Sequence, residues 1–180
     1  FRRVLFRSVF DATKMAWMNG LYIRSLPVGE FVARCKPFME QAGVRVPDEQ
    51  FAALAPHVQE RVKTLTEVPP MLDFLSDKPL EREMSAMYQK GIDGPKAREV
   101  LARSITALEA IPEFTVESID QALRGVATEL GLKAGPTFGV LRVAVTGKTI
   151  TPPLFESFAV VGKDTVLSRL RETLGLIPQQ

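Results

Sequence analysis

Apolar residues recur at intervals of three and four along nearly the whole chain, which is the spacing of an α-helix with one buried face. The segment after Pro27 is an example, because Phe31, Cys35 and Met39 fall on one side of a helix. The best candidate for a strand is 140–145, where valine and leucine favour sheets, but it has no obvious neighbour with which to pair. The sequence therefore predicts an all-α, multihelical fold.

Capping residues and helix breakers divide this pattern into separate helices. Asp11 and Asp48 are expected to cap helices, and Asp93 and Thr115 mark two further starts. Glycine favours the left-handed conformation that ends many helices, whereas proline interrupts them. We expect stops at Gly20, Gly43, Gly91, Gly131 and Gly175, a kink or division at Pro37, a break at Pro69-Pro70, and late helices over 136–146, 152–161 and 164–174.

Pro79 is the expected boundary between two small helical subdomains, residues 9–78 and 79–180. Residues 1–8 fit neither, since they are basic and apolar and carry no small-residue cleavage site. They resemble a translated sequencing adapter more than a short targeting segment, so we exclude them from the reasoning about fold and function. On this interpretation the native sequence starts near Val9, within a longer protein whose larger N-terminal part is missing.

Composition excludes several classes of function. The net charge of +2, from 23 basic and 21 acidic residues, is too small to indicate nucleic-acid binding by itself. No apolar run approaches the roughly 20 residues of a membrane-spanning helix. Cys35 and His57 are the only residues of their types, which rules out an intrachain disulfide, a multi-cysteine zinc site and a two-histidine metal site. The lone cysteine fits a reducing, cytoplasmic setting.

The polar motifs offer no catalytic site. We interpret His57 as a structural histidine, Cys35 as a small buried thiol, and the acidic residues near Pro79 as solvated surface. The segment 146–149 superficially resembles the end of a phosphate-binding loop but lacks the preceding glycine at the required spacing. A helix end followed by a turn is the simpler interpretation, with Lys148 complementing the negative end of that helix.

Arg142 is a charged residue inside an otherwise apolar helical run, so it must face water, pair with a carboxylate or meet a ligand. A salt bridge or a solvent-directed side chain is one interpretation. Recognition of a phosphate or a base is the other, because the guanidinium group offers a planar fork of donors. Arg61, at the end of the third expected helix, is the second arginine of interest, and the residues alone leave both interpretations open.

Several segments, taken in order, carry a resemblance to a known family. They are 10–24, 36–38 with 42–43, 61–69, and 132–147 followed by 153–156 and 167–170. Each segment alone is moderately specific. Their order and spacing together resemble the C-terminal, anticodon-binding half of bacterial glutamyl-tRNA synthetase, a class I enzyme, and the resemblance covers nearly everything after Val9.

The resemblance implies the all-helical cage with which class I synthetases bind an anticodon. Residues 9–78 would comprise the end of the stem-contact region and the first anticodon-binding part, and 79–180 the second. Arg61 and Arg142 match the family's anticodon-contacting arginines, and Arg61 would read the third anticodon base and help to separate glutamate from glutamine tRNA. Thr151 lies where another contact is expected. Weaker candidates for phosphate contacts are Lys14, Arg24 and Lys148, with solvated surface as the alternative.

The family's nucleotide-binding signatures, of His-Ile-Gly-His and Lys-Met-Ser-Lys-Ser type, do not occur in the chain. The resemblance therefore implies that the catalytic domain, with its ATP and Mg²⁺, lies outside these residues, which would have no cofactor or metal of their own and would be inactive alone. The expected partners are tRNA(Glu) and the N-terminal catalytic domain of the same, monomeric protein.

Two other interpretations stay open. A helical protein–protein interaction module would explain the near-neutral charge and the many apolar faces. A related synthetase that also charges tRNA(Gln) with glutamate would share most of these motifs, and the retained Arg61 argues against it only mildly.

Overall fold

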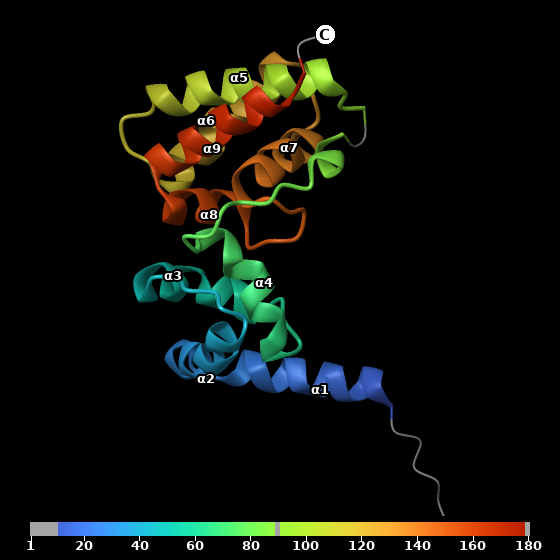
Figure 1. Ribbon diagram of the computed structural model, residues 1–180, viewed down its shortest axis with the longest axis vertical. Coiled ribbons are helices and arrows are strands. Elements are labelled where there is room, and N and C mark those ends of the chain that lie inside the picture. Colours follow the sequence, from blue (N-terminus) through green and yellow to red (C-terminus); the bar gives the residue numbers. More distant parts are fainter. Residues whose placement is uncertain (1–10, 89–90, 179–180) are drawn as a thin grey trace, which may run out of the picture.

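The computed structural model describes residues 11–88 and 91–178, and in these residues the regular structure is helical throughout (Figure 1). The predicted all-α fold is thus confirmed. The molecule is elongated, with α1–α4 gathered at one end and α5–α9 at the other. The segment 1–8, interpreted above as an artefact, lies outside the described residues.

The helices are α1 (Ala12–Ser25), α2 (Val28–Gln41), α3 (Asp48–Gln59), α4 (Val68–Leu72), α5 (Gly94–Ala110), α6 (Val116–Glu129), α7 (Ala134–Thr146), α8 (Leu154–Val161) and α9 (Lys163–Leu176), with 3₁₀ turns η1 (Leu65–Glu67), η2 (Asp73–Leu75) and η3 (Met84–Met87).

Three of the predicted helix starts are confirmed by side-chain caps. The Asp11 carboxylate accepts hydrogen bonds from the backbone N–H groups of Thr13 and Lys14 at the start of α1. Asp93 caps α5 in the same way, and Thr115 caps α6 in a reciprocal capping box with Ser118. Each cap satisfies N–H groups that have no partner inside the helix, which explains why these residues begin helices here.

The predicted stop of α1 at Gly20 is wrong, because the helix continues to Ser25. Gly20 is buried in the helix interior, where an added Cβ would lie 3.5 Å from the Lys63 side chain. The end of α1 is held instead by buried Gln59, whose amide donates to the carbonyls of Ile23 at 2.7 Å and Leu26 at 2.8 Å. Packing against α3 therefore outweighs the local preference of glycine.

Two other local predictions differ from the structure, the cap at Asp48 and the division of α2, one of the two outcomes expected at Pro37. Asp48 does not cap α3; it is the first helical residue, and its carboxylate pairs with Lys36 Nζ at 3.1 Å. Helix α2 is not divided at Pro37, since it runs unbroken to Gln41 with Phe31, Cys35 and Met39 buried along one face. Burial of that face offsets the cost of about 3 kcal/mol that an interior proline imposes.

Five other breakers, two prolines and three glycines, behave in two ways. Pro69 and Pro70 do not interrupt the chain; they occupy the first turn of α4, where a missing N–H leaves no helical bond unmade. Helix α9 passes through Gly175 and ends at Leu176, so that predicted stop is also wrong. Gly43 and Gly131 follow their helices with φ of +63°, as expected for glycine at a helix end.

The buried side chains form two clusters. The first cluster comprises Ile23, Phe31, Cys35, Met39, Val44, Phe51, Leu54, Ala55, Val58, Val62, Val68, Met71, Leu72, Phe74 and Leu75, from α1–α4. The second cluster is formed by α5–α9 and includes Leu101, Leu108, Leu123, Leu141, Phe158 and Leu170. Val160 and Val161 of α8 also pack against the first cluster, which makes α8 and α3 the joint between the two. The predicted division at Pro79 falls between the two clusters in sequence and stays a prediction.

Candidate nucleic-acid interface

Arg61 and Arg142 converge on one residue, Thr151. Arg61 follows the C-terminal end of α3, and its Nη1 donates to the Thr151 carbonyl at 2.6 Å. Arg142 projects from α7, and its Nη1 donates to Thr151 Oγ1 at 2.7 Å and to the Pro152 carbonyl at 2.8 Å. The loop between α7 and α8 therefore lies between two guanidinium groups that come from different clusters.

Thr151 supports the two arginines from inside the protein. It is only 1% exposed, and its hydroxyl group accepts from Arg142 and donates to the Pro152 carbonyl at 3.2 Å. The position expected to contact a ligand is thus buried, and its carbonyl and hydroxyl oxygens both accept from the arginines. Thr151 is placed to orient Arg61 and Arg142.

The pair of arginines creates a local excess of positive charge. Arg142 is half-buried, and its pKa is lowered first by burial and then by the neighbouring charge of Arg61, against the opposing effect of the Glu156 carboxylate. In the described part of the chain, no carboxylate lies within 4.0 Å of either guanidinium group. An anionic or hydrogen-bond-accepting ligand would relieve this unbalanced charge.

Each arginine borders a cleft. Arg61 lines a cleft of about 730 Å³ whose walls are Glu67, Pro70, Met71, Glu83, Lys148, Thr149 and the 75%-exposed Ile150. Arg142 lines a second cleft of about 340 Å³ with Phe138, Gly135, Gly139 and Thr149. Apolar walls beside guanidinium donors suit planar rings that carry acceptor groups, such as unpaired bases.

Lys148 is held by contacts within the protein. Its Nζ donates to the Pro70 carbonyl at 3.0 Å and pairs with the Asp73 carboxylate. The expectation that Lys148 complements the end of its own helix is therefore replaced by a tie from the second cluster to the first. Much of its charge is already balanced, although it still lines the cleft beside Arg61.

Lys14 and Arg24 lie on α1, apart from Thr151. Arg24 is exposed, and its guanidinium packs over Gly20, where an added Cβ would also meet the Lys63 side chain. Lys14 is exposed, and no contact in the described residues connects its side chain to the two arginines. The structure thus brings together Arg61, Arg142, Thr151 and Lys148, but neither Lys14 nor Arg24.

The other candidates for chemistry are structural. Cys35 is fully buried, and burial raises the pKa of its thiol to about 12, so the reactive thiolate is suppressed. His57 lies half-buried on α3. Among the described residues, no group of three or more histidine, cysteine or acidic side chains is arranged to hold a metal ion. No described helix is both long and apolar enough to cross a membrane.

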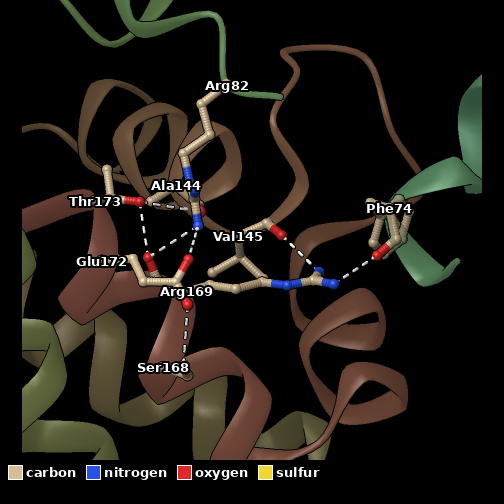
Figure 2. A network of polar contacts seen from close by, with 8 residues as sticks. All are labelled: Phe74, Arg82, Ala144, Val145, Ser168, Arg169, Glu172 and Thr173. Atoms are coloured by element: carbon tan, nitrogen blue, oxygen red, sulfur yellow. Dashed lines mark hydrogen bonds and ion pairs between the residues drawn. The ribbon is translucent and has the colours of Figure 1, made fainter. Parts of the chain in front are cut away.

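Sequence reasoning missed two arginines. Arg82 and Arg169 donate to several backbone carbonyls, and Figure 2 shows them around the end of α7. Arg169 belongs to a segment that carried the family resemblance, but its polar position on an amphipathic helix gave no sign of a special role.

The comparisons agree on one family. The anticodon-binding domain family matches residues 30–174 of this chain. The glutamate–tRNA ligase of Acidothermus cellulolyticus is 39% identical over 175 residues, which are 93% of this chain and 35% of the relative. That of Salinispora arenicola is 40% identical, covering 94% of this chain and 38% of the relative.

A solved structure gives the same picture at the level of the fold. The glutamate–tRNA ligase of Elizabethkingia meningosepticum superposes with a TM-score of 0.79 at 20% identity, over 94% of this chain and 33% of that one. The chain thus spans about a third of the length of the relatives that it matches.

Proposed function

The chain belongs to the anticodon-binding domain family, and we propose that it recognises the anticodon loop of tRNA(Glu) as part of a glutamate–tRNA ligase. The observation that carries this proposal is the meeting of Arg61 and Arg142 on Thr151, between two clefts. Protein recognition of RNA loops works on unpaired bases, which are splayed out, stacked and hydrogen-bonded on their edges. Two clefts with one arginine each fit that mode of binding.

Arg61 is proposed to read the third anticodon base. Only its Nη1 has a protein acceptor in the described residues, which leaves the other N–H groups of the fork for a base in the larger cleft. Arg142 is half-buried and borders the smaller cleft, so it would contact a neighbouring base or phosphate. Thr151 would act through the two arginines. Lys14 and Arg24 remain proposed phosphate contacts on α1.

The activity of the complete protein is part of the same proposal. It would activate glutamate with ATP and Mg²⁺ and transfer it to tRNA, in parts of the polypeptide outside these 180 residues. The contribution of the present residues would be differential binding, because correct anticodon contacts help to place the acceptor end in a distant active site. We propose a monomeric enzyme of the cytoplasm. The alternative of a protein–protein interaction module receives no support from the comparisons.

The test is a filter-binding comparison of tRNA(Glu) with a variant of it whose anticodon has been changed. We expect the chain to prefer tRNA(Glu), and Arg61→Ala to reduce the preference about tenfold, as for the loss of one directed base contact. Arg103→Ala is the matched control, because Arg103 is an exposed arginine on α5, in the second cluster. Equal affinity of the unmodified chain for both RNAs would contradict the proposed function.

Salt dependence separates RNA binding from the protein-interaction alternative. Contacts with several phosphates release counterions, so the affinity for RNA is expected to fall steeply between about 50 and 200 mM salt. A binding constant that hardly changes over this range would point away from an RNA-binding surface.

A further inference from the structure

Arg169 of α9 holds two carbonyl groups that belong to different clusters (Figure 2). Its Nη1 donates to the Val145 carbonyl at 2.9 Å, and its Nη2 donates to the Phe74 carbonyl at 2.8 Å. Val145 lies in the last turn of α7, in the second cluster, whereas Phe74 lies in η2, in the first. One planar group therefore bridges the two clusters.

The acceptors at the end of α7 are available because the last carbonyls of a helix have no partner within it. The Val143 carbonyl is taken by the N–H of Gly147, and the Ala144 carbonyl accepts from Arg82 Nε at 3.0 Å. Arg169 takes the Val145 carbonyl. The two arginines thus satisfy two of the last carbonyls of α7, where positive charge also complements the helix dipole.

Arg82, and not Arg169, forms the ion pair with the nearby carboxylate of Glu172. Its Nη2 pairs with the Glu172 carboxylate at 2.9 Å, and its side chain is only 9% exposed. Arg169 has no carboxylate within 4.0 Å in the described residues, although burial and the charge of Arg82 both lower its pKa. The two contacts of Arg169 are therefore directed hydrogen bonds, whose geometry depends on the planar fork of the side chain.

Within residues 11–88 and 91–178, three other side chains donate hydrogen bonds between the clusters, and each is exposed or partly exposed. Gln50 Nε2 donates to the Val160 carbonyl at 3.2 Å, Lys148 Nζ to the Pro70 carbonyl at 3.0 Å, and Arg61 Nη1 to the Thr151 carbonyl at 2.6 Å. Gln50 and Arg61 make one such bond each, and Lys148 adds its ion pair with Asp73, so both contacts of Lys148 go to residues from α4 and η2. Arg169 differs because its two bonds fix both the helix that carries Arg142 and the segment that follows Asp73.

We propose that Arg169 is a positioning residue that sets the orientation of the first cluster relative to α7, and so brings Arg61 and Arg142 together on Thr151. Arg142 lies on α7, one turn before Val145, so the bond to Val145 holds the helix that presents it. The bond to Phe74 holds the cluster that presents Arg61. The consequence for RNA binding rests on the proposed function, whereas the consequence for the orientation of the clusters does not.

The test uses the full chain with a spin label on each cluster, at Ala53→Cys on α3 and Ala102→Cys on α5. Both alanines are exposed, and the native Cys35 is buried and stays unlabelled. Pulsed electron paramagnetic resonance then gives the distribution of distances between the labels. Arg169→Met is compared with Arg171→Met, a matched control on the same helix whose arginine pairs with Glu109 within the second cluster.

We expect Arg169→Met to broaden the distance distribution at an unchanged helical content, and Arg171→Met to leave the distribution as narrow as in the unmodified chain. Arg169→Lys is expected not to restore it, because an ammonium group cannot reproduce the fork. The affinity for a cognate anticodon stem-loop is expected to fall about tenfold in Arg169→Met, as for a residue that couples two sites.

A narrow, unshifted distribution in Arg169→Met would overturn the proposal. Loss of helical content in both Arg169→Met and Arg169→Lys would also overturn it, since each cluster is supposed to keep its own fold. If Arg169→Met alone fails to fold, the distribution of Arg169→Lys decides. Should the unmodified chain show no preference for the cognate stem-loop, the proposed function fails while the distance measurement still decides the role of Arg169.

Discussion

Arg61 donates to the backbone carbonyl of Thr151 across a separation of 90 residues, at a distance of 2.6 Å. The same threonine accepts from Arg142 through its hydroxyl group. A buried residue thus holds two positive side chains from different hydrophobic clusters at one place on the surface. This relationship makes the joint between the clusters part of the candidate RNA-binding site.

Thr151→Val tests the supporting role of the hydroxyl group. Valine keeps the shape but removes one of the two acceptors of half-buried Arg142, whose bond to the Pro152 carbonyl remains, so we expect a loss of about 1 kcal/mol in the free energy of unfolding, measured with urea. Cognate RNA affinity should fall as well, although Thr151 is only 1% exposed. Thr151→Ser retains the hydroxyl group and serves as the control. Unchanged stability and affinity in Thr151→Val would remove the residue from the site.

Lys148→Met separates a structural tie from a phosphate contact. Because the Lys148 ammonium group is already bound to Asp73 and to the Pro70 carbonyl, we expect stability to fall by about 1 kcal/mol. The slope of RNA affinity against salt concentration should stay the same. Lys14→Met, at an exposed lysine on α1, is the comparison. A shallower salt slope in Lys148→Met would instead identify a phosphate contact.

Gly147→Ala is expected to cost at least about 2 kcal/mol, because the residue has φ of +80° and an added Cβ would lie 2.2 Å from the Glu81 carbonyl oxygen. Gly125→Ala gives the opposite expectation. Gly125 lies exposed inside α6 with nothing within 4 Å of an added Cβ, so alanine should stabilise by about 0.5–1 kcal/mol. Urea unfolding measures both. Equal effects of the two substitutions would contradict both the positive φ of Gly147 and the close approach of the Glu81 carbonyl.

Cys35 predicts a dependence of stability on alkaline pH. Burial raises the pKa of its thiol from 9.0 to about 12, so the folded chain keeps a proton that the unfolded chain releases between these values. The contribution of Cys35 to the free energy of unfolding should therefore be constant below pH 9 and fall as the pH rises toward 12. Cys35→Ala lacks this contribution, so the difference in urea midpoint between the two proteins, measured at pH 8 and pH 10.5, should change. A constant difference would show that the thiol is not shielded.

Local signals in the sequence predicted the fold where the interaction itself is local. Asp11, Asp93 and Thr115 bind N–H groups within three residues, and all three begin helices as expected. The predicted helix end at Gly20 was wrong because α1 is held by contacts with Gln59 and Lys63, which lie far along the chain. Glycine and proline predicted helix ends poorly where the same helix has buried residues beyond them, as at Gly20 and Pro37.

The candidate site was predictable in part. Arg142 is conspicuous as a charge in an apolar run, and the family resemblance added Arg61, but neither indicates that Thr151 lies between them. Arg169 had no distinguishing signal, since an arginine on the polar side of a helix is common and its acceptors are backbone carbonyls. Every residue has such a carbonyl, so no residue type reveals which one is used.

Backbone acceptors make the joint unequally sensitive to genetic change. Substitution at position 70, 74, 151 or 160 leaves a peptide oxygen in place, whichever amino acid the new codon specifies. The donors have no such protection, because a missense change at Gln50, Arg61, Lys148 or Arg169 to a residue without a side-chain N–H group removes the bond. As far as these bonds are concerned, the residues at the acceptor positions can change during evolution, provided that the four donor residues are kept.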